Sequence, residues 1–413
     1  MSTKSKLKSP IIFIVCGKSP LKSYGGGYST FALNLAKVLK SFGYKIFVVA
    51  IGEKNQRIET PYGTLLLFKT FYFDYYTTAL PSLPLSSYIF SRGIKKIVEE
   101  ENCERFIVWG IGPWGFVGSI LKNEYKDNMY FINNYFTTLK HEWYGALQAL
   151  DVKDYGIFVK LKFFFLYHTI VAFLSQLEKI IIFKADLIIT NYRSTEIILQ
   201  KQFGISQSKF TRTTFLTEVY SRQAQEHKKN NIDLPKRYLL YLSRHDPRKG
   251  INFLLHAVDI LAKKGIHIPL VIAGTGQMIE ANKKLAKKLN ISDIVHFVGF
   301  VNDPTEIMKN AEVFCFPTVE EGAGALIINE AMSLGLPIVA TACDGIVEDI
   351  ENGKSGILVP VKDPSSFAQA IEQLIENPQY AKMLGNNAKK RYKQLFTYAR
   401  MREDIKQILR KYL

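Results

Sequence analysis

The feature that most constrains this chain is a repeated alternation of short apolar runs with segments of helical period. Ile11 to Cys16 reads as a strand, Thr30 to Phe42 as an amphipathic helix, and Lys45 to Ile51 as a second strand. The later strand candidates are Phe106 to Trp109, Tyr130 to Asn133, Leu187 to Thr190, Tyr238 to Leu242, Leu270 to Ala273, Val295 to Val298, Val313 to Phe316 and Ile338 to Thr341. The alternation predicts an α/β fold in which helices cover both faces of parallel sheets.

The length and the grouping of the strands predict two domains. The chain has 413 residues, and its strand candidates form two series separated by a polar, charged stretch near residues 204 to 236. We therefore predict an N-terminal Rossmann-like domain over 1–212, a C-terminal one over 213–395, and a linker at the split. The basic helical tail is expected to pack back on the first domain from about residue 396 to 413, or to remain a surface helix of the second.

The overall composition limits the classes of partner. The formal net charge is +17, which favours an anionic partner such as nucleotide phosphate, an acidic membrane face or nucleic acid. No nucleic-acid-binding module is recognised, so nucleic acid is not expected. The four cysteines are scattered without a Cys-x-x-Cys pair, which argues against a disulfide framework or a zinc site and favours a cytoplasmic protein.

Two apolar stretches raise the question of membrane targeting. The run after the basic N-terminus is short and leads into Gly17 and Lys18, so a first strand is expected in place of a signal peptide. The apolar run Phe163 to Leu174 is shorter than the ~20 residues that span a bilayer, so no spanning helix is expected. Phe71 to Tyr76 and Val159 to Leu174 are instead candidates for peripheral contact with an anionic membrane on its inner face, or for buried segments.

The loops that follow the strands carry the candidate binding groups, because ligands of open parallel sheets bind at the carboxyl ends of the strands. Arg244 and Lys249 lie in the loop after the first strand of the second series, where two cations could neutralise a diphosphate. Glycines after other strands could let the backbone approach a phosphate, and an aromatic strand end could hold a flat base: Gly25, Gly26, Gly27, Gly274, Gly276, Phe300 and Val301. Flexible turns, a solvated basic loop and a half-buried strand edge are the alternatives.

The segment from Thr318 to Thr341 is the most informative of these loops. Glu320 and Glu321 precede Gly322-Ala323-Gly324, and Glu330 follows on the first turns of a predicted helix. A glycine turn at a helix N-terminus can bind phosphate through its amides, and a carboxylate can chelate a diol. The pattern predicts a site for a polyhydroxylated anion.

In order, these motifs resemble family 4 of the retaining glycosyltransferases, which have the GT-B fold. The resemblance covers residues 238 to 398 and continues through Gly345-Ile346-Val347-Glu348 and Asn352 to Val359; it is looser in the first half, at Gly25 to Gly27 and Ala185 to Asn191. It implies that Arg244 and Lys249 contact the donor diphosphate, and that Glu330 holds the ribose. It also implies roles near the donor for these residues: Glu321 at the sugar, the backbone of Gly324, Ala325 and Leu326 at phosphate, and Phe300-Val301 at the base.

The sequence departs from the family pattern in two places. Eight residues separate Glu321 from Glu330, where the family usually has seven. Many relatives place a histidine in the first domain facing the donor sugar, and here either His141 or Asn134 could take that position, although a structural role is the alternative for His141.

The resemblance implies a metal-independent enzyme of polysaccharide biosynthesis. It would transfer a sugar from a nucleotide-diphosphate donor to a glycan, lipid-linked or other acceptor with retention of configuration. No further cofactor is expected, and the metal clamp motif Asp-x-Asp occurs nowhere in the chain. A non-catalytic nucleotide-sugar-binding protein of the same fold is the main alternative. An epimerase of that fold is another, while a nicotinamide oxidoreductase would need a Gly-x-Gly-x-x-Gly motif that the chain lacks.

Overall fold

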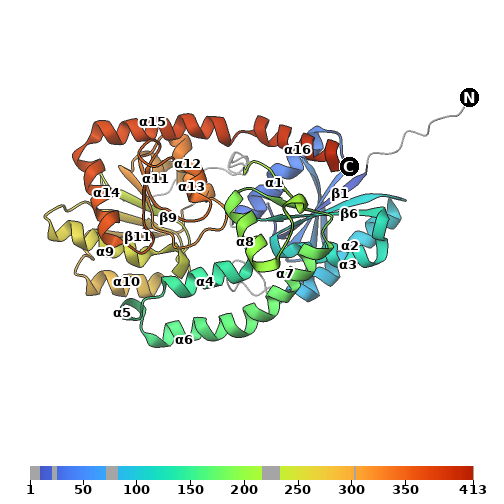
Figure 1. Ribbon diagram of the computed structural model, residues 1–413, viewed down its shortest axis with the longest axis horizontal. Helices are drawn as coiled ribbons and strands as arrows, with labels where there is room; N and C mark the ends of the chain where they lie inside the picture. Colours follow the sequence, from blue (N-terminus) through green and yellow to red (C-terminus); the bar gives the residue numbers. More distant parts are fainter. Residues whose placement is uncertain (1–9, 21–25, 71–81, 216–232, 302–303, 413) are drawn as a thin grey trace, which may run out of the picture.

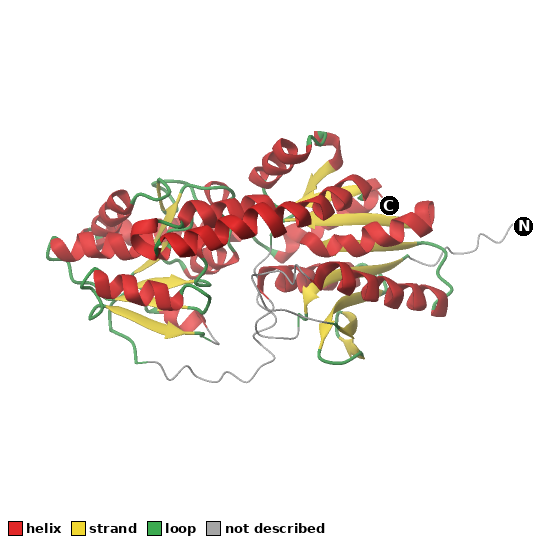
Figure 2. Cartoon of the chain, turned by 90° about the horizontal axis from the view of Figure 1, so that it is seen from below, coloured by secondary structure: helices red, strands yellow, loops and turns green. Residues whose placement is uncertain are grey.

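Two lobes, each built on its own β-sheet, form the computed structural model, which describes residues 10–20, 26–70, 82–215, 233–301 and 304–412. Figures 1 and 2 show the lobes side by side along the long axis of the molecule. The N-terminal lobe has an eight-stranded sheet in the order β3-β4-β2-β1-β5-β6-β7-β8, and the C-terminal lobe a six-stranded sheet in the order β11-β10-β9-β12-β13-β14. The predicted α/β fold is confirmed.

The N-terminal lobe contains strands and helices in alternation, interrupted by the antiparallel pair β3 and β4. Its strands are β1 (Ile11–Lys18), β2 (Ile46–Gly52), β3 (Gln56–Thr60), β4 (Gly63–Lys69), β5 (Phe106–Ile111), β6 (Met129–Tyr135), β7 (Leu187–Thr190) and β8 (Phe210–Arg212). Its helices are α1 (Gly26–Ser41), α2 (Leu83–Glu100), α3 (Phe116–Tyr125), α4 (Leu139–Ala149), α5 (Val152–Tyr155), α6 (Ile157–Leu166), α7 (Ala172–Lys184) and α8 (Arg193–Phe203).

The C-terminal lobe repeats the plan. Its strands are β9 (Leu239–Leu242), β10 (Leu270–Ala273), β11 (Val295–Gly299), β12 (Val313–Phe316), β13 (Ile338–Thr341) and β14 (Ile357–Val359). Its helices are α9 (Ile251–Lys263), α10 (Ile279–Lys288), α11 (Pro304–Lys309), α12 (Leu326–Leu334), α13 (Ile346–Asp349), α14 (Pro364–Glu376) and α15 (Pro378–Leu395), and α16 (Tyr398–Tyr412) follows.

β1 shows why a continuous apolar run predicted a strand covered on both faces. Ile12 and Ile14 lie in one buried cluster together with residues of α1, whereas Phe13 and Val15 lie in a second cluster on the other face. Successive strand residues point to opposite faces, so a strand with helices on both sides needs apolar residues at every position. β3 was not predicted, because it is a polar edge strand that pairs antiparallel with β4.

The stretch predicted as a linker is partly structured. Residues Phe210–Arg212 form β8, which pairs in parallel with β7, and Phe215 is buried in the N-terminal core. The prediction was wrong for residues 207–215, because the polar sequence hid a short edge strand; residues 216–232 lie outside the described part of the chain. At the other end, α16 buries Met401, Ile405 and Ile408 in the cluster that also contains β1 and α1. Figure 1 shows α15 leading from one lobe into α16 on the other.

The segment from α4 to α7 (residues 139–184), which we call the arm, leaves the N-terminal sheet and returns to it. Figure 1 shows it along the lower edge of the molecule, with α5 beside α10 of the other lobe. Its second half is one helix, Ile157–Lys184, of 28 residues, long and apolar enough by length and composition to cross a membrane. The expectation that no segment reaches that length was wrong, because the helix continues through lysines that interrupt the apolar run. A π-helical turn, Tyr167–Val171, joins α6 to α7.

Candidate active site

The predicted cations Arg244 and Lys249 lie in the loop between β9 and α9, and Lys249 ends a short 3₁₀ turn, Pro247–Lys249. Gly250 has a φ of 66°, and a Cβ there would overlap the carbonyl of Pro317, so only glycine allows this loop to pack against the end of β12. Lys249 is buried, pairs with Glu321 and lies 5.3 Å from the ring centre of Phe316. Arg244 is exposed. Burial, with the nearby charges of Arg248 and Arg244, lowers the pKa of Lys249.

Arg248, which the sequence analysis did not select, is the centre of a buried charge network between the lobes. Its guanidinium lies 3.0 Å from the carboxylate of Glu142 on α4 and 3.2 Å from that of Glu320. Burial disfavours the charge, but these carboxylates raise the pKa of Arg248 and keep it protonated. Burial also raises the pKa of Glu320 to about 7, against the influence of Arg248. The only sequence signal was position, directly before Lys249.

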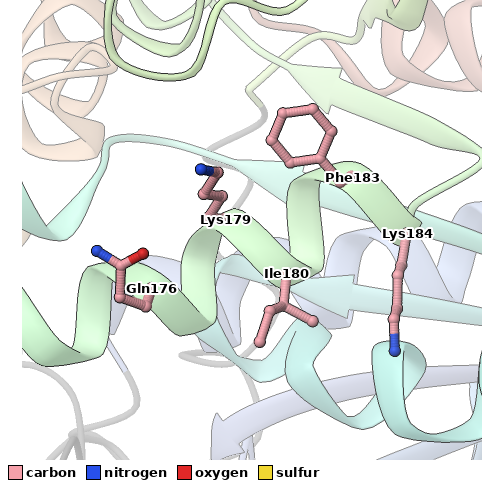
Figure 3. Close-up of a pocket in the computed structure, with 5 residues that line it drawn as sticks. All are labelled: Gln176, Lys179, Ile180, Phe183 and Lys184. Carbon is pink, nitrogen blue, oxygen red and sulfur yellow. The ribbon is translucent and has the colours of Figure 1, made fainter.

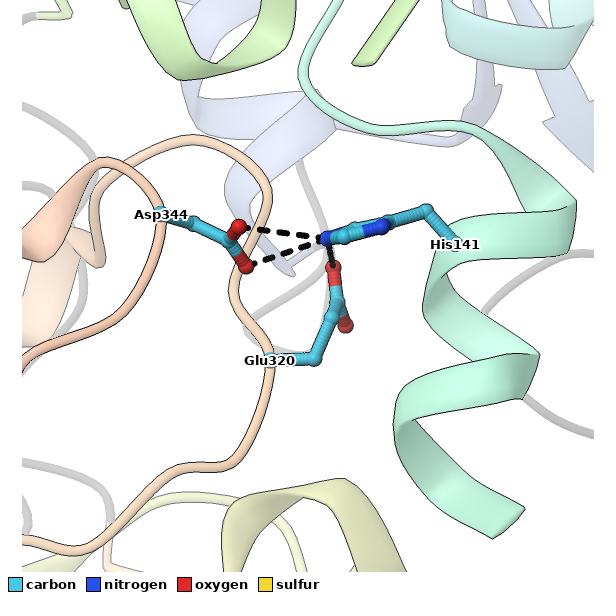
Figure 4. Close-up of side chains that lie close together, drawn as sticks. All are labelled: His141, Glu320 and Asp344. Carbon is cyan, nitrogen blue, oxygen red and sulfur yellow. Dashed lines mark hydrogen bonds and ion pairs between the residues drawn. The ribbon is translucent and has the colours of Figure 1, made fainter. Parts of the chain in front are cut away.

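His141 joins the same site from the N-terminal lobe. Its Nε2 lies 3.2 Å from both carboxylate oxygens of Asp344 and 3.7 Å from Glu320 (Figure 4). Asp344 also accepts hydrogen bonds from the backbone N–H groups of Glu321 and Gly322. Burial lowers the pKa of His141, but the hydrogen bond to Asp344 and the charge of Glu320 outweigh it, so that the pKa is raised.

Asn134, the other candidate for the histidine position, lies elsewhere. It is buried at the end of β6, and its side-chain amide donates to Asn191 at 3.1 Å. Of the two candidates, the structure thus brings His141 to the loop that carries Glu321.

Close backbone approaches hold the two lobes together at this point. A Cβ at Gly145 of α4 would overlap the side chain of Glu320, and a Cβ at Gly322 would overlap Thr137. Thr137 donates to Glu320 at 3.1 Å. The glycine of the loop and the glycine of the helix are therefore both required for the lobes to meet.

The two predicted anion loops face each other across the same contact. Gly26 begins α1, and a Cβ at the neighbouring Gly27 would lie 3.4 Å from Leu326, the first residue of α12. Ala325 is buried and caps α12, and the side chain of Leu326 packs against the N-terminal core. The N-termini of α1 and α12 consequently lie close together, as a shared phosphate site would require.

The region around Gly324 holds polar groups that the sequence analysis missed. A Cβ at Gly324 would overlap the hydroxyl of Tyr192 and the carboxylate of Asp349, both buried. Burial raises the pKa of Asp349 well above its usual value. Asn329 is separated from Glu321 by seven residues, the usual family spacing, and is buried on α12 beside Tyr192, whereas Glu330 is half-buried.

The other predicted glycines support the loop that carries Arg244. Gly274 has a φ of 130° and Gly276 one of 152°, and a Cβ at either would meet the backbone of Ser243 or His245. Gly274 and Gly276 therefore have a structural role, because they allow this close packing. Phe300 is exposed and Val301 buried, after the edge strand β11. Two strand spacings, roughly 10 Å, separate β11 from β9, the strand that leads into the Lys249 loop.

The cluster of His141, Glu320 and Asp344 has the donor set of a metal site, since its ligand atoms all lie within 4.8 Å of one another. Its hydrogen bonds already engage both His141 and Asp344, however, and Asp344 holds two backbone amides as well. These contacts explain the cluster as a structural link between the lobes.

Comparisons with known proteins agree with this geometry. Residues 222–391 match the family Glycosyl transferases group 1. The chain is 32% identical over 157 residues to an uncharacterized glycosyltransferase of Methanocaldococcus jannaschii (38% of this chain, 40% of the relative), and 33% identical over 175 residues to the putative glycosyltransferase EpsD of Bacillus subtilis (42% and 45%). It therefore spans less than half the length of these relatives.

Solved structures match over almost the whole chain. The sucrose-phosphate synthase of Thermosynechococcus elongatus superposes with a TM-score of 0.76 at 20% identity, covering 98% of this chain and 99% of that one. HepE of Anabaena in complex with UDP-glucose gives a TM-score of 0.67 at 17% identity, covering 97% and 99%. The chain thus has the GT-B fold, and the match to the family Glycosyl transferases group 1 falls mainly on its C-terminal lobe.

Proposed function

We propose that this protein transfers a sugar from a nucleotide-diphosphate donor to a glycan or lipid-linked acceptor. The observation that carries the proposal is that His141 of one lobe and Lys249 of the other converge on the loop of Glu320 and Glu321, within the segment that matches the family model. The proposal is also supported by relatives that are named as glycosyltransferases, which favours an enzyme over a non-catalytic binder.

In the proposed reaction, the bond from the anomeric carbon to the diphosphate breaks and a bond to the acceptor oxygen forms on the same face of the sugar. The acceptor's proton leaves with the diphosphate. Lys249 and Arg244 would stabilise the negative charge that develops on the departing phosphate, together with the amides at the start of α12. The residues near the donor would keep the roles given by the resemblance, with His141 at the sugar and Glu330 at the ribose.

The finer points of the proposal concern the donor, the stereochemistry and the metal. Fixed cations at the diphosphate would remove the need for a metal ion, so activity should survive a chelator. HepE was solved with UDP-glucose, and one relative is named for transfer to a diphospho-undecaprenol acceptor, which together favour a nucleotide sugar and a lipid-linked acceptor as first choices. Retention would appear as an α-linked product from an α-linked donor in an NMR spectrum.

A donor screen tests the proposal directly. One of the UDP-, GDP- or ADP-sugars should stabilise the protein against heating, by ~2.7 kcal/mol at one hundred times its dissociation constant. With that donor, Lys249→Met should reduce turnover by about 100-fold, because a preorganised cation is lost from the transition state. Lys382→Met, on an exposed lysine of α15, is the control and should leave turnover unchanged.

Two results would count against it. If no nucleotide sugar stabilises the protein, the proposed donor site is wrong. If one binds but is neither transferred nor slowly hydrolysed, the non-catalytic alternative is correct.

A further inference from the structure

The long helix of the arm carries an apolar ridge on its outward face. Nine of its large apolar side chains are exposed, among them Phe158 at 84%, Phe165 at 66% and Phe173 at 67%. The others are Ile157, Leu161, Phe164, Ile170, Ile180 and Phe183. Only 17% of the most apolar window of this helix is buried. An apolar surface of this size on a helix roughly 40 Å long indicates a binding partner.

The opposite face of the helix packs against the rest of the protein. Phe163, Val171, Leu174 and Ile181 are buried, and the ring of Phe163 lies 5.8 Å from that of Trp143 on α4. The carboxylate of Glu178 accepts a hydrogen bond from the backbone N–H of Leu139. These contacts tie the helix lengthwise to its lobe, so the partner has to approach from the outer side, and the helix does not need to cross a bilayer.

The charges around the ridge are of one sign. Glu178 is the only acidic residue between Ile157 and Lys184, and it is buried. Four lysines occupy the same helix, at positions 160, 162, 179 and 184. A shallow hollow of about 390 Å³ on α7 is lined by Lys179, Ile180 and Phe183 (Figure 3). Lys184 also lines it, but its ammonium donates to Asn123 of α3. Ammonium groups next to apolar side chains fit an anionic headgroup above its acyl chains.

We infer that this ridge lies in the interface of an anionic lipid bilayer, with the helix parallel to the membrane plane. A second copy of the chain is the weaker occupant, because two such ridges would bring their lysines together without an acidic residue to compensate. Figure 1 shows α6 along the lower edge of the molecule, where a flat surface could approach it. The inference is independent of the proposed catalytic activity.

Vesicle flotation tests this inference with the full chain. The protein should float with vesicles of phosphatidylcholine and phosphatidylglycerol and bind far less to phosphatidylcholine alone. Phe158→Ser should lower the partition coefficient by about tenfold or more, because a buried phenylalanine is lost from the bilayer. Met383→Ser, at an exposed apolar residue of α15 on the opposite edge of the molecule, should bind like the unmodified protein.

Charge and self-association provide the second readout. Lys179→Glu should weaken binding to the anionic vesicles, whereas Lys390→Glu on α15 should have a much smaller effect. Sedimentation velocity without vesicles tests whether a second copy of the chain covers the ridge instead. The inference is overturned if the protein does not float, if Phe158→Ser floats normally, or if the ridge variants abolish a dimer and leave vesicle binding unaltered.

Discussion

Two of the contacts between the lobes differ in how deeply their charges are buried. At the inner contact, Arg248 bridges Glu142 of α4 and Glu320, and all three side chains are buried. At the outer contact, α5 of the arm touches α9 and α10: Asp154 accepts from His256 at 2.9 Å and from Asn252 at 3.1 Å. His256 is one-third exposed. The inner contact should therefore govern stability, while the outer one should only limit how far the lobes open.

Removing the central cation should have the largest effect. Arg248→Met leaves Glu142 and Glu320 buried without their partner, which typically costs about 3–5 kcal/mol. Denaturant unfolding should show that loss. Arg244→Met removes an exposed arginine from the same loop and should change stability by less than about 0.5 kcal/mol. If both variants lost the same free energy of unfolding, the burial of Arg248 would not explain its contribution to stability.

A smaller effect, dependent on pH, is expected at the edge of the inner contact. The pKa of His141 is raised above 6.5, so the folded protein binds this proton more tightly than the unfolded chain does. Its stabilising contribution is complete below pH 6.5 and is lost as the pH rises through the raised value. His141→Gln should thus be less stable than the unmodified protein by about 1 kcal/mol below pH 6.5, and the difference should shrink toward pH 8.

Thermal melts of both proteins across this pH range measure the difference. Lys201→Gln on the neighbouring α8 is a suitable control, because it removes an exposed charge from a hollow that His141 and Asp344 also line. A difference that stays constant with pH would show that His141 acts through packing alone.

The smallest effect should follow from the outer contact. Hydrogen bonds from His256 and Asn252 lower the pKa of Asp154 even though its burial raises it. Asp154→Asn keeps the shape but removes the charge, and should cost less than about 1 kcal/mol. Small-angle scattering should show a more open molecule than in Asp259→Asn, whose ion pair with Lys263 lies within α9. A compact Asp154→Asn protein would show that the charge of Asp154 does not limit the opening of the lobes.

Much of the fold and part of the site were open to prediction from the sequence. The strand and helix periods identified both sheets, and the positions of Arg244, Lys249 and Glu321 after strands placed them on loops at the carboxyl edge. Four strands were not predicted, namely β3, β4, β8 and β14. β3, β8 and β14 are edge strands, which can be polar or short, whereas the apolar strand β4 was missed. The full length of the arm helix was not predicted either. Lysines among the phenylalanines of its outward face made the apolar run look shorter than the helix is.

The sequence by itself determined which segments form helices, strands and loops, because helix and strand periods and glycine turns depend on a few neighbouring residues. Only the tertiary structure decided which distant groups become partners. His141 and Asp344 are 203 positions apart, and nothing local to either specifies the other. Their pairing, like that of Arg248 with Glu142, depends on how two separately folded lobes pack together, with glycines at the few points where their backbones must nearly touch.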